Sequence, residues 1–151
     1  MNSLPERRRL LALQQWRQQR AERVLHQSQR QLQALRAELA GFAGQEASLQ
    51  QLLASHRATD CVLERVQLLA LLRTQAVIRR QLDLLRVEHD HVAGQCRALE
   101  QSLQVQREHL REARRRHDTC ARSVQQGMRA QRQEQLRREE REMDDMSGVR
   151  R

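Results

Sequence analysis

Leucines recur at a heptad spacing through the first third of the chain. When Leu11 is placed at position a, the a and d positions from Leu25 to Leu53 are mostly leucine. Ser28 and Glu46 are the polar exceptions, and the pattern is weaker before Leu25. Apolar residues at this spacing share one face of a helix. The stretch therefore predicts a long helix with a coiled-coil seam, the stripe formed by its a and d positions.

A second heptad frame begins near Cys61 and continues to Val124, over about nine heptads with mostly apolar a and d positions. It is out of register with the first frame, because eight residues rather than seven separate Leu53 from Cys61. The intervening residues 54–60 are mostly polar. Together, the change of frame and the polar segment predict a reversal of the chain.

Both expected helix starts carry capping residues. Ser3 and Glu6 occupy the positions of a capping box, and Pro5 is tolerated in a first turn. Thr59 or Asp60 can cap the second helix. The expected organisation is a single domain over 1–151, with a helix over about 4–55, a turn at about 56–60, a helix over about 61–143 and a frayed tail over 144–151.

The predicted fold is all-α, an antiparallel coiled-coil hairpin of two long helices in which the second is longer. At 1.5 Å per residue the helices would measure roughly 75 Å and 120 Å. A tight reversal would place residue 5 near residue 110 and leave the second helix uncovered from about residue 113. A turn at 41–44, beside Gly41 and Gly44, is a less favoured alternative because the first frame continues through it.

Composition agrees with a long-helix protein. Trp16 and Phe42 are the only aromatic residues, and Leu, Ala, Gln, Glu and Arg dominate. These are good helix formers, whereas sheet proteins need aromatic and β-branched residues. The N-terminus lacks the apolar stretch of a signal peptide, and the longest apolar run, residues 66–72, is too short to span a bilayer. The sequence predicts a cytoplasmic protein.

Metal binding and catalysis are not expected. His117 and Cys120, or His89 and His91, have ligand-like spacing, but most of them fall on the seam, where polar residues usually set register. The three cysteines form no C-x-x-C pair and are odd in number, which favours a reducing compartment. The chain contains no lysine and therefore no phosphate-binding G-x-x-x-x-G-K motif. We expect no enzymatic activity, no cofactor and no small-molecule substrate.

Positive charge is concentrated in two segments. Residues 1–25 hold six arginines and two glutamates, and residues 107–128 hold six arginines and three acidic residues, whereas 26–106 is nearly balanced. In the expected hairpin both segments lie at one end, which would be basic. This end is a candidate docking surface for an acidic partner. The arginine triplets that would meet there are Arg7, Arg8 and Arg9, and Arg114, Arg115 and Arg116.

The run LQQWRQQRAER at residues 13–23 resembles the opening run of the YscO/FliJ family of type III secretion, an apolar residue followed by Arg-x-x-Arg-Ala-Glu. Trp16 stands where an aliphatic residue is more usual. Chain length, the basic first helix and the long-helix hairpin resemble the family as well. The likeness in architecture covers nearly the whole chain, and the opening run favours an injectisome over a flagellar system.

This resemblance implies a central stalk, similar to the γ subunit of rotary ATPases. Family members place the paired ends of the hairpin in the pore of a hexameric export ATPase. They also contact the cytoplasmic domain of the export gate and, in some cases, chaperones. A monomeric hairpin peripheral to the membrane-embedded apparatus is implied. Arg17 and Arg20 carry over from the motif as candidate contacts, and the charge argument adds Arg7, Arg8, Arg9, Arg23, Arg114, Arg115 and Arg116.

Two other functions fit the same sequence. One is a generic coiled-coil scaffold that dimerises in parallel, and the other is an arginine-rich nucleic-acid-binding coiled coil. Nucleic acid is less favoured because Trp16 alone is a poor platform for stacking successive bases. Membrane adsorption ranks lower again, because the leucines before Trp16 would pack on the partner helix.

Overall fold

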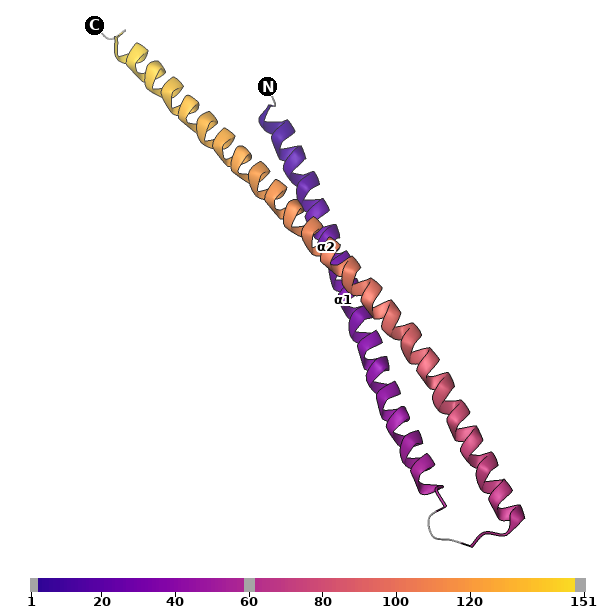
Figure 1. Cartoon of the computed structure of the whole chain (residues 1–151). Coiled ribbons are helices and arrows are strands. Elements are labelled where there is room, and N and C mark those ends of the chain that lie inside the picture. Colours follow the sequence, from indigo (N-terminus) through magenta and orange to yellow (C-terminus); the bar gives the residue numbers. More distant parts are fainter. Residues whose placement is uncertain (1–2, 59–61, 149–151) are drawn as a thin grey trace. The chain divides into compact units, whose positions relative to one another are not determined.

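The computed structural model describes residues 3–58 and 62–148. They form two helices, α1 (Leu4–Ser55) and α2 (Arg65–Gly148), and no strand occurs among them (Figure 1). Cross-helix ion pairs join Arg36 to Glu100 and Glu22 to Arg114, so rising numbers on α1 meet falling numbers on α2. The predicted fold class, an all-α antiparallel hairpin with a longer second helix, is confirmed.

Helix α1 begins at Leu4, directly after its capping residue Ser3. The backbone N–H of Ser3 donates to the Glu6 carboxylate at 2.8 Å, and the N–H of Arg7 donates to the Ser3 carbonyl at 3.0 Å. The first bond is the reciprocal half of a capping box. At the other end, the Leu52 carbonyl accepts from the Ser55 hydroxyl at 2.7 Å and from the backbone N–H of His56 at 3.3 Å.

Helix α2 begins at Arg65, four residues later than expected. The N–H of Glu64 donates to the Gln67 side-chain oxygen at 3.1 Å, which places Glu64 as the cap of this helix. The caps expected at Thr59 and Asp60 lie outside the described residues. At its far end α2 continues to Gly148, so residues 144–148 are helical rather than frayed. The alternative turn at 41–44 is wrong, because α1 passes through these residues.

The chain divides into two compact units, which we describe separately. Unit 1 comprises Met1–Leu25 and Val105–Arg151, and unit 2 comprises His26–Gln104. In unit 2, α1 and α2 bury a stripe of mostly apolar side chains between them. Salt bridges at the edge of this stripe join Arg36 to Glu100 at 2.8 Å and Arg86 to Glu46 at 3.2 Å. The buried side chains of unit 2 are Ser28, Leu32, Ile78, Leu82, Leu85, Val92, Cys96 and Leu103.

Unit 1 is packed in the same way but with a smaller buried core, formed by Gln14, Leu25, Leu110 and Val124. The start of α1 lies close to α2 at Gly127, where an added Cβ would be 3.1 Å from Leu4 Cδ1. Beyond this point α2 continues alone, and residues 128–148 are exposed throughout.

Both predicted heptad frames coincide with the packed faces. In α1, every a and d residue from Leu11 to Leu53 is buried or half-buried. In α2 the same holds from Leu71 to Val124, whereas Leu68 is exposed. The periodicity therefore identified the packed face of each helix correctly, including polar a and d residues such as Gln14.

The expected pairing of the two helices is wrong by about two heptads. Arg7 lies against Ser123 rather than near residue 110, and α1 covers α2 up to Gly127 rather than to residue 111. The uncovered part of unit 1 is therefore 128–148. Within unit 2 the pairing also differs from the expected one, because the Gln75 amide donates at 2.7 Å to the carbonyl of His56, the residue that follows α1. A seam that repeats every seven residues does not itself fix which heptads face each other.

Candidate interaction surfaces

Most of the candidate histidine and cysteine ligands lie on the seam, whereas His91 is exposed and lies off it. Cys96 is buried, and His89, His117 and Cys120 are half-buried at a and d positions. Among residues 3–58 and 62–148, no group of three or more His, Cys, Asp or Glu side chains is placed to hold a metal ion. Those on the seam pack between the two helices.

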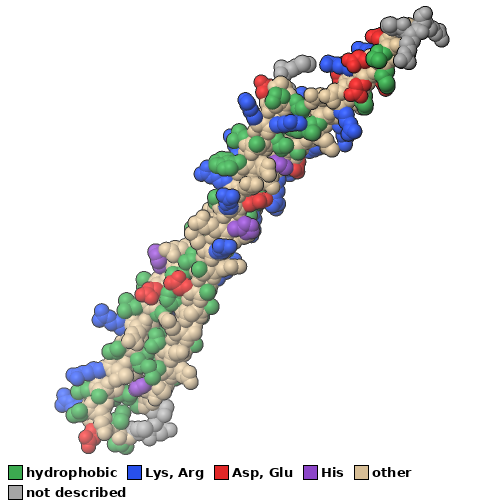
Figure 2. Space-filling model, turned by 180° about the vertical axis from the view of Figure 1, so that it is seen from behind, with side chains coloured by type: hydrophobic (Ala, Val, Ile, Leu, Met, Phe, Trp, Pro, Cys, Tyr) green, Lys and Arg blue, Asp and Glu red, His purple; other side chains and the backbone are tan. Residues whose placement is uncertain are grey.

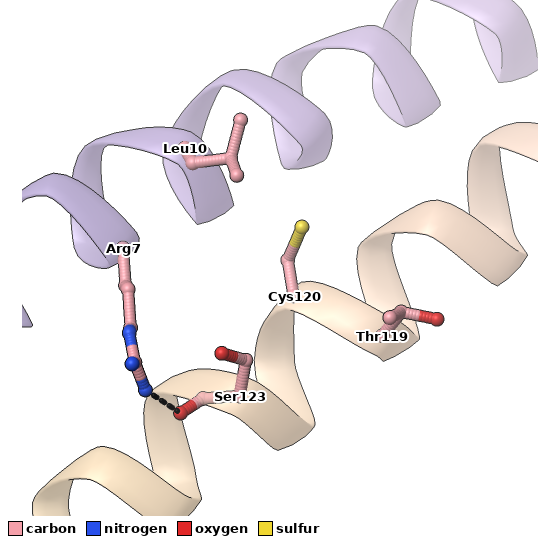
Figure 3. A pocket seen from close by; sticks show the side chains of 5 residues that line it. All are labelled: Arg7, Leu10, Thr119, Cys120 and Ser123. Carbon is pink, nitrogen blue, oxygen red and sulfur yellow. Dashed lines mark hydrogen bonds between the residues drawn. The ribbon is translucent and has the colours of Figure 1, made fainter. Parts of the chain in front are cut away.

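The first arginine triplet of unit 1 is partly tied to the helix pair. Arg7 is half-buried, and its guanidinium donates to the Ser123 carbonyl at 3.4 Å beside a small groove (Figure 3). Leu10, Thr119 and Cys120 also line this groove. Arg7 thus helps to attach the start of α1 to α2.

Arg8 and Arg9 are exposed. Arg8 lines a different groove of about 460 Å³, together with residues at the start of the uncovered part of α2. Two of these, Arg129 and Arg132, are also arginines. This gathering of guanidinium groups makes the groove suited to carboxylates or other anions.

The second arginine triplet, residues 114–116, lies at a different position along the helices of unit 1. Arg114 pairs with Glu22 across the helices at 3.1 Å, and Arg116 pairs with Glu112 on its own helix. Arg115 is exposed. Along α2, Arg115 is eight residues from Ser123, the partner of Arg7, which corresponds to about 12 Å. The two triplets therefore belong to the same unit, as expected, but lie at different positions along α2, because the helices pair in a different register.

Arg17 and Arg20 line a groove of about 510 Å³ between the two helices of unit 1. Trp16 and Val24 form apolar parts of it, and His109 contributes from α2. Arg23 lies one turn beyond Arg20 and is exposed. The charged residues suggested by the sequence motif thus surround an exposed tryptophan.

An apolar surface in unit 2 was not predicted. Val66, Leu69 and Leu72 are 76%, 46% and 49% exposed in the first turns of α2, before the end of α1 meets that helix at Gln75. The preceding Val62 is exposed as well. A seam needs two apolar residues in every seven, and the run 66–72 holds more than that. This excess is the sequence feature that could have predicted the apolar surface.

The uncovered part of α2 in unit 1, residues 128–148, is highly charged. Figure 2 shows basic and acidic side chains intermingled along it. It holds five arginines and six acidic residues, and Met128, Leu136, Met143 and Met146 are its exposed large apolar residues. This segment resembles a solvated helix more than a second seam.

None of the described helices is both long and apolar enough to cross a membrane. No curated protein and no solved structure matches the chain. A family model does match, over residues 6–147, and its description is Salmonella surface presentation of antigen gene type M protein. This family is associated with type III secretion, in agreement with the system implied by the YscO/FliJ-like run, although it does not bear that family's name. Since the match covers nearly the whole chain, the protein belongs to the Salmonella surface presentation of antigen gene type M family, a family of type III secretion.

Proposed function

We propose that this protein is a non-enzymatic stalk or adaptor that couples the hexameric export ATPase of a type III secretion system to the cytoplasmic domain of its export gate. In this role it acts in the cytoplasm as a monomeric hairpin, peripheral to the membrane-embedded apparatus. Secretion chaperones are further candidate partners. Membership of a secretion family supports the assignment to a type III secretion system. The exposed surfaces of the two units support the role of a stalk or adaptor.

One observation carries the proposal: the two helices bear chemically different exposed surfaces on separate units. Unit 1 exposes Arg8, Arg9, Arg17, Arg20, Arg23 and Arg115. Unit 2 exposes the apolar surface around Val66 and Leu69. A coupling protein needs two contacts that do not compete, and basic and apolar surfaces select different partners.

Each arginine of the candidate set has a role in this proposal. The exposed ones contact the ATPase or the gate directly. Arg7 and Arg114 bond to the opposite helix of unit 1 and so position the two helices, whereas Arg116, which is exposed like Arg114, pairs with Glu112 on its own helix.

Coupling follows from differential binding. A helical stalk that contacts the ATPase subunits unequally stabilises some conformational states of the ring over others. Only the difference in binding free energy between those states changes the hydrolysis cycle. A surface that binds every state equally would hold the protein in place without affecting the rate.

The test is the ATP hydrolysis rate of the purified secretion ATPase with and without this protein. We expect the protein to co-purify with the hexamer and to raise the rate, and R17A/R20A/R23A to weaken both effects. R73A/R79A/R80A removes the same number of charges from unit 2 and should retain both effects. A wild-type protein that neither binds the ATPase nor changes its rate would contradict the proposed function.

A further inference from the structure

The groove beside Trp16 in unit 1 has the properties of a specific binding site. Its α1 side consists of Trp16, Arg17, Arg20, Ala21 and Val24, and its α2 side consists of Gln106 and His109. Its volume of about 510 Å³ is within the range of protein pockets that hold a ligand group. All of these residues belong to unit 1, so one compact unit builds the whole groove.

Trp16 is exposed, although the packed face of α1 lies nearby. The side chain is 54% exposed and stands at neither an a nor a d position of the seam. Val24, two turns further along α1, is 41% exposed and lines the same groove. Tryptophan is the residue type most enriched among those that dominate the binding energy of protein interfaces.

A cation–π contact restrains the tryptophan. The Arg20 guanidinium carbon lies 5.4 Å from the centre of the Trp16 ring, one helical turn away. Holding the indole in one orientation before a partner arrives reduces the entropy lost on binding. The contact also places positive charge directly beside the apolar surface.

The charge around the groove specifies the chemistry of its occupant. Arg17 and Arg20 line it, and none of its lining residues named above is acidic. The surrounding segments 1–25 and 105–128 together carry twelve arginines and five acidic residues. An occupant with carboxylates beside an apolar side chain would complement both features.

We propose that this groove binds an acidic amphipathic helix of a partner protein. A large apolar side chain of that helix packs against Trp16 and Val24, while carboxylates flanking it pair with Arg17 and Arg20. This inference extends the proposed function and rests on it, because the secretion system is where the protein would meet such a partner. Trp16 is then the main apolar contact, and the arginines make the groove selective for partners that carry carboxylates.

A single-stranded nucleic acid is a less suitable occupant. Base-stacking proteins present aromatic side chains to successive bases, whereas the only other aromatic residue here, Phe42, is half-buried on the seam of unit 2. Val24 adds apolar surface that favours an aliphatic side chain over a nucleotide.

Trp16 provides its own spectroscopic probe, because it is the only tryptophan in the chain. The full-length protein is titrated with a helical peptide of about 18 residues, five turns, with leucines on one face, glutamates beside them and no Trp or Tyr. We expect a blue shift of Trp16 emission, slower quenching by acrylamide, and binding that weakens with salt. A matched peptide with glutamine for glutamate should bind about tenfold more weakly. No spectral change with the acidic peptide, or equal binding of the glutamine peptide, would overturn the proposal.

Variants and a competing ligand complete the test, with binding followed by isothermal titration calorimetry. W16A should weaken binding of the acidic peptide about tenfold or more, and R17A/R20A should do the same, whereas R79A/R80A should not. Circular dichroism checks that helix content is unchanged. Tighter binding of an oligo-dT strand than of the peptide would overturn the proposal in favour of nucleic acid.

The same variants separate this inference from the proposed function. If W16A stimulates the ATPase as well as wild type does and still binds the acidic peptide, the groove inference is overturned and the stalk role stands. If wild type binds the peptide through Trp16 but leaves the ATPase unaffected, the stalk role is overturned and the groove stands.

Discussion

Arg114 and Glu22 form an ion pair across the two helices of unit 1, with 3.1 Å between guanidinium nitrogen and carboxylate oxygen. The two side chains come from segments 92 residues apart in the sequence, and their pairing is possible only in the observed helix register. A pairing with residue 5 near residue 110 would separate them. The contact is thus a specific test of how the helices align.

Removing this ion pair should have a small but measurable effect on stability. Both side chains are partly exposed, so solvent screens their attraction, and a coupling energy of about 0.3–0.5 kcal/mol is expected. A double-mutant cycle with E22A, R114A and the double variant, read by urea unfolding, measures it. The coupling should decrease at high salt. A coupling of zero at low salt would contradict the expected contribution of this pair to stability.

Leucines on the seam and off it should differ strongly in their contribution to stability. Leu82 is 5% exposed and Leu84, two residues along the same helix, is 57% exposed. We expect L82A to lower the free energy of unfolding of unit 2 by about 2–4 kcal/mol, because it opens a cavity in the seam. L84A serves as the matched control and should cost about 0.5 kcal/mol or less. Equal costs in urea denaturation would contradict the assigned seam.

The helix register can be tested with a natural cysteine. Leu10 and Cys120 line the same groove of unit 1 (Figure 3), so an L10C variant brings a second thiol close to Cys120. With the other two cysteines replaced by alanine, a short bis-maleimide should link the two helices within one chain. Mass spectrometry identifies the linked peptides. A parallel dimer would instead yield chains joined through the same residue, and the originally expected register would yield no link to Cys120.

Gly94 makes α2 less stable than alanine would at this position, and no close packing contact requires a glycine there. It lies inside α2, and a Cβ added there would meet nothing within 4 Å. G94A should therefore raise the unfolding free energy by up to about 1 kcal/mol, because alanine loses less backbone entropy in a helix.

Gly127 provides the contrast. An added Cβ there would lie 3.1 Å from Leu4 and 3.4 Å from Arg7, so G127A should stabilise less than G94A. Thermal unfolding followed by circular dichroism compares the two variants. A larger gain at Gly127 than at Gly94 would show that the start of α1 is not packed as described.

The sequence alone determined the helices, their packed faces and the secretion system. Heptad spacing of leucine places side chains on one helical face regardless of what they meet, so the packed a and d residues could be identified from Leu11 to Leu53 and from Leu71 to Val124. The capping pattern at Ser3 and Glu6 acts through neighbouring backbone groups, and for this reason the start of α1 was also predictable. The YscO/FliJ-like run pointed to type III secretion, with which the matching family is associated.

Only the tertiary structure decided which heptads face each other. Because the seam repeats every seven residues, several pairings bury the same leucines, and the choice among them depends on the length of the connection and on contacts such as Gln75 with His56. That choice separates the arginine triplet at Arg7 from that at Arg114, and it leaves Val66 and Leu69 without cover from α1. It also brings His109 beside Trp16 and so builds the groove. These surfaces depend on contacts between distant residues, which local sequence patterns do not specify.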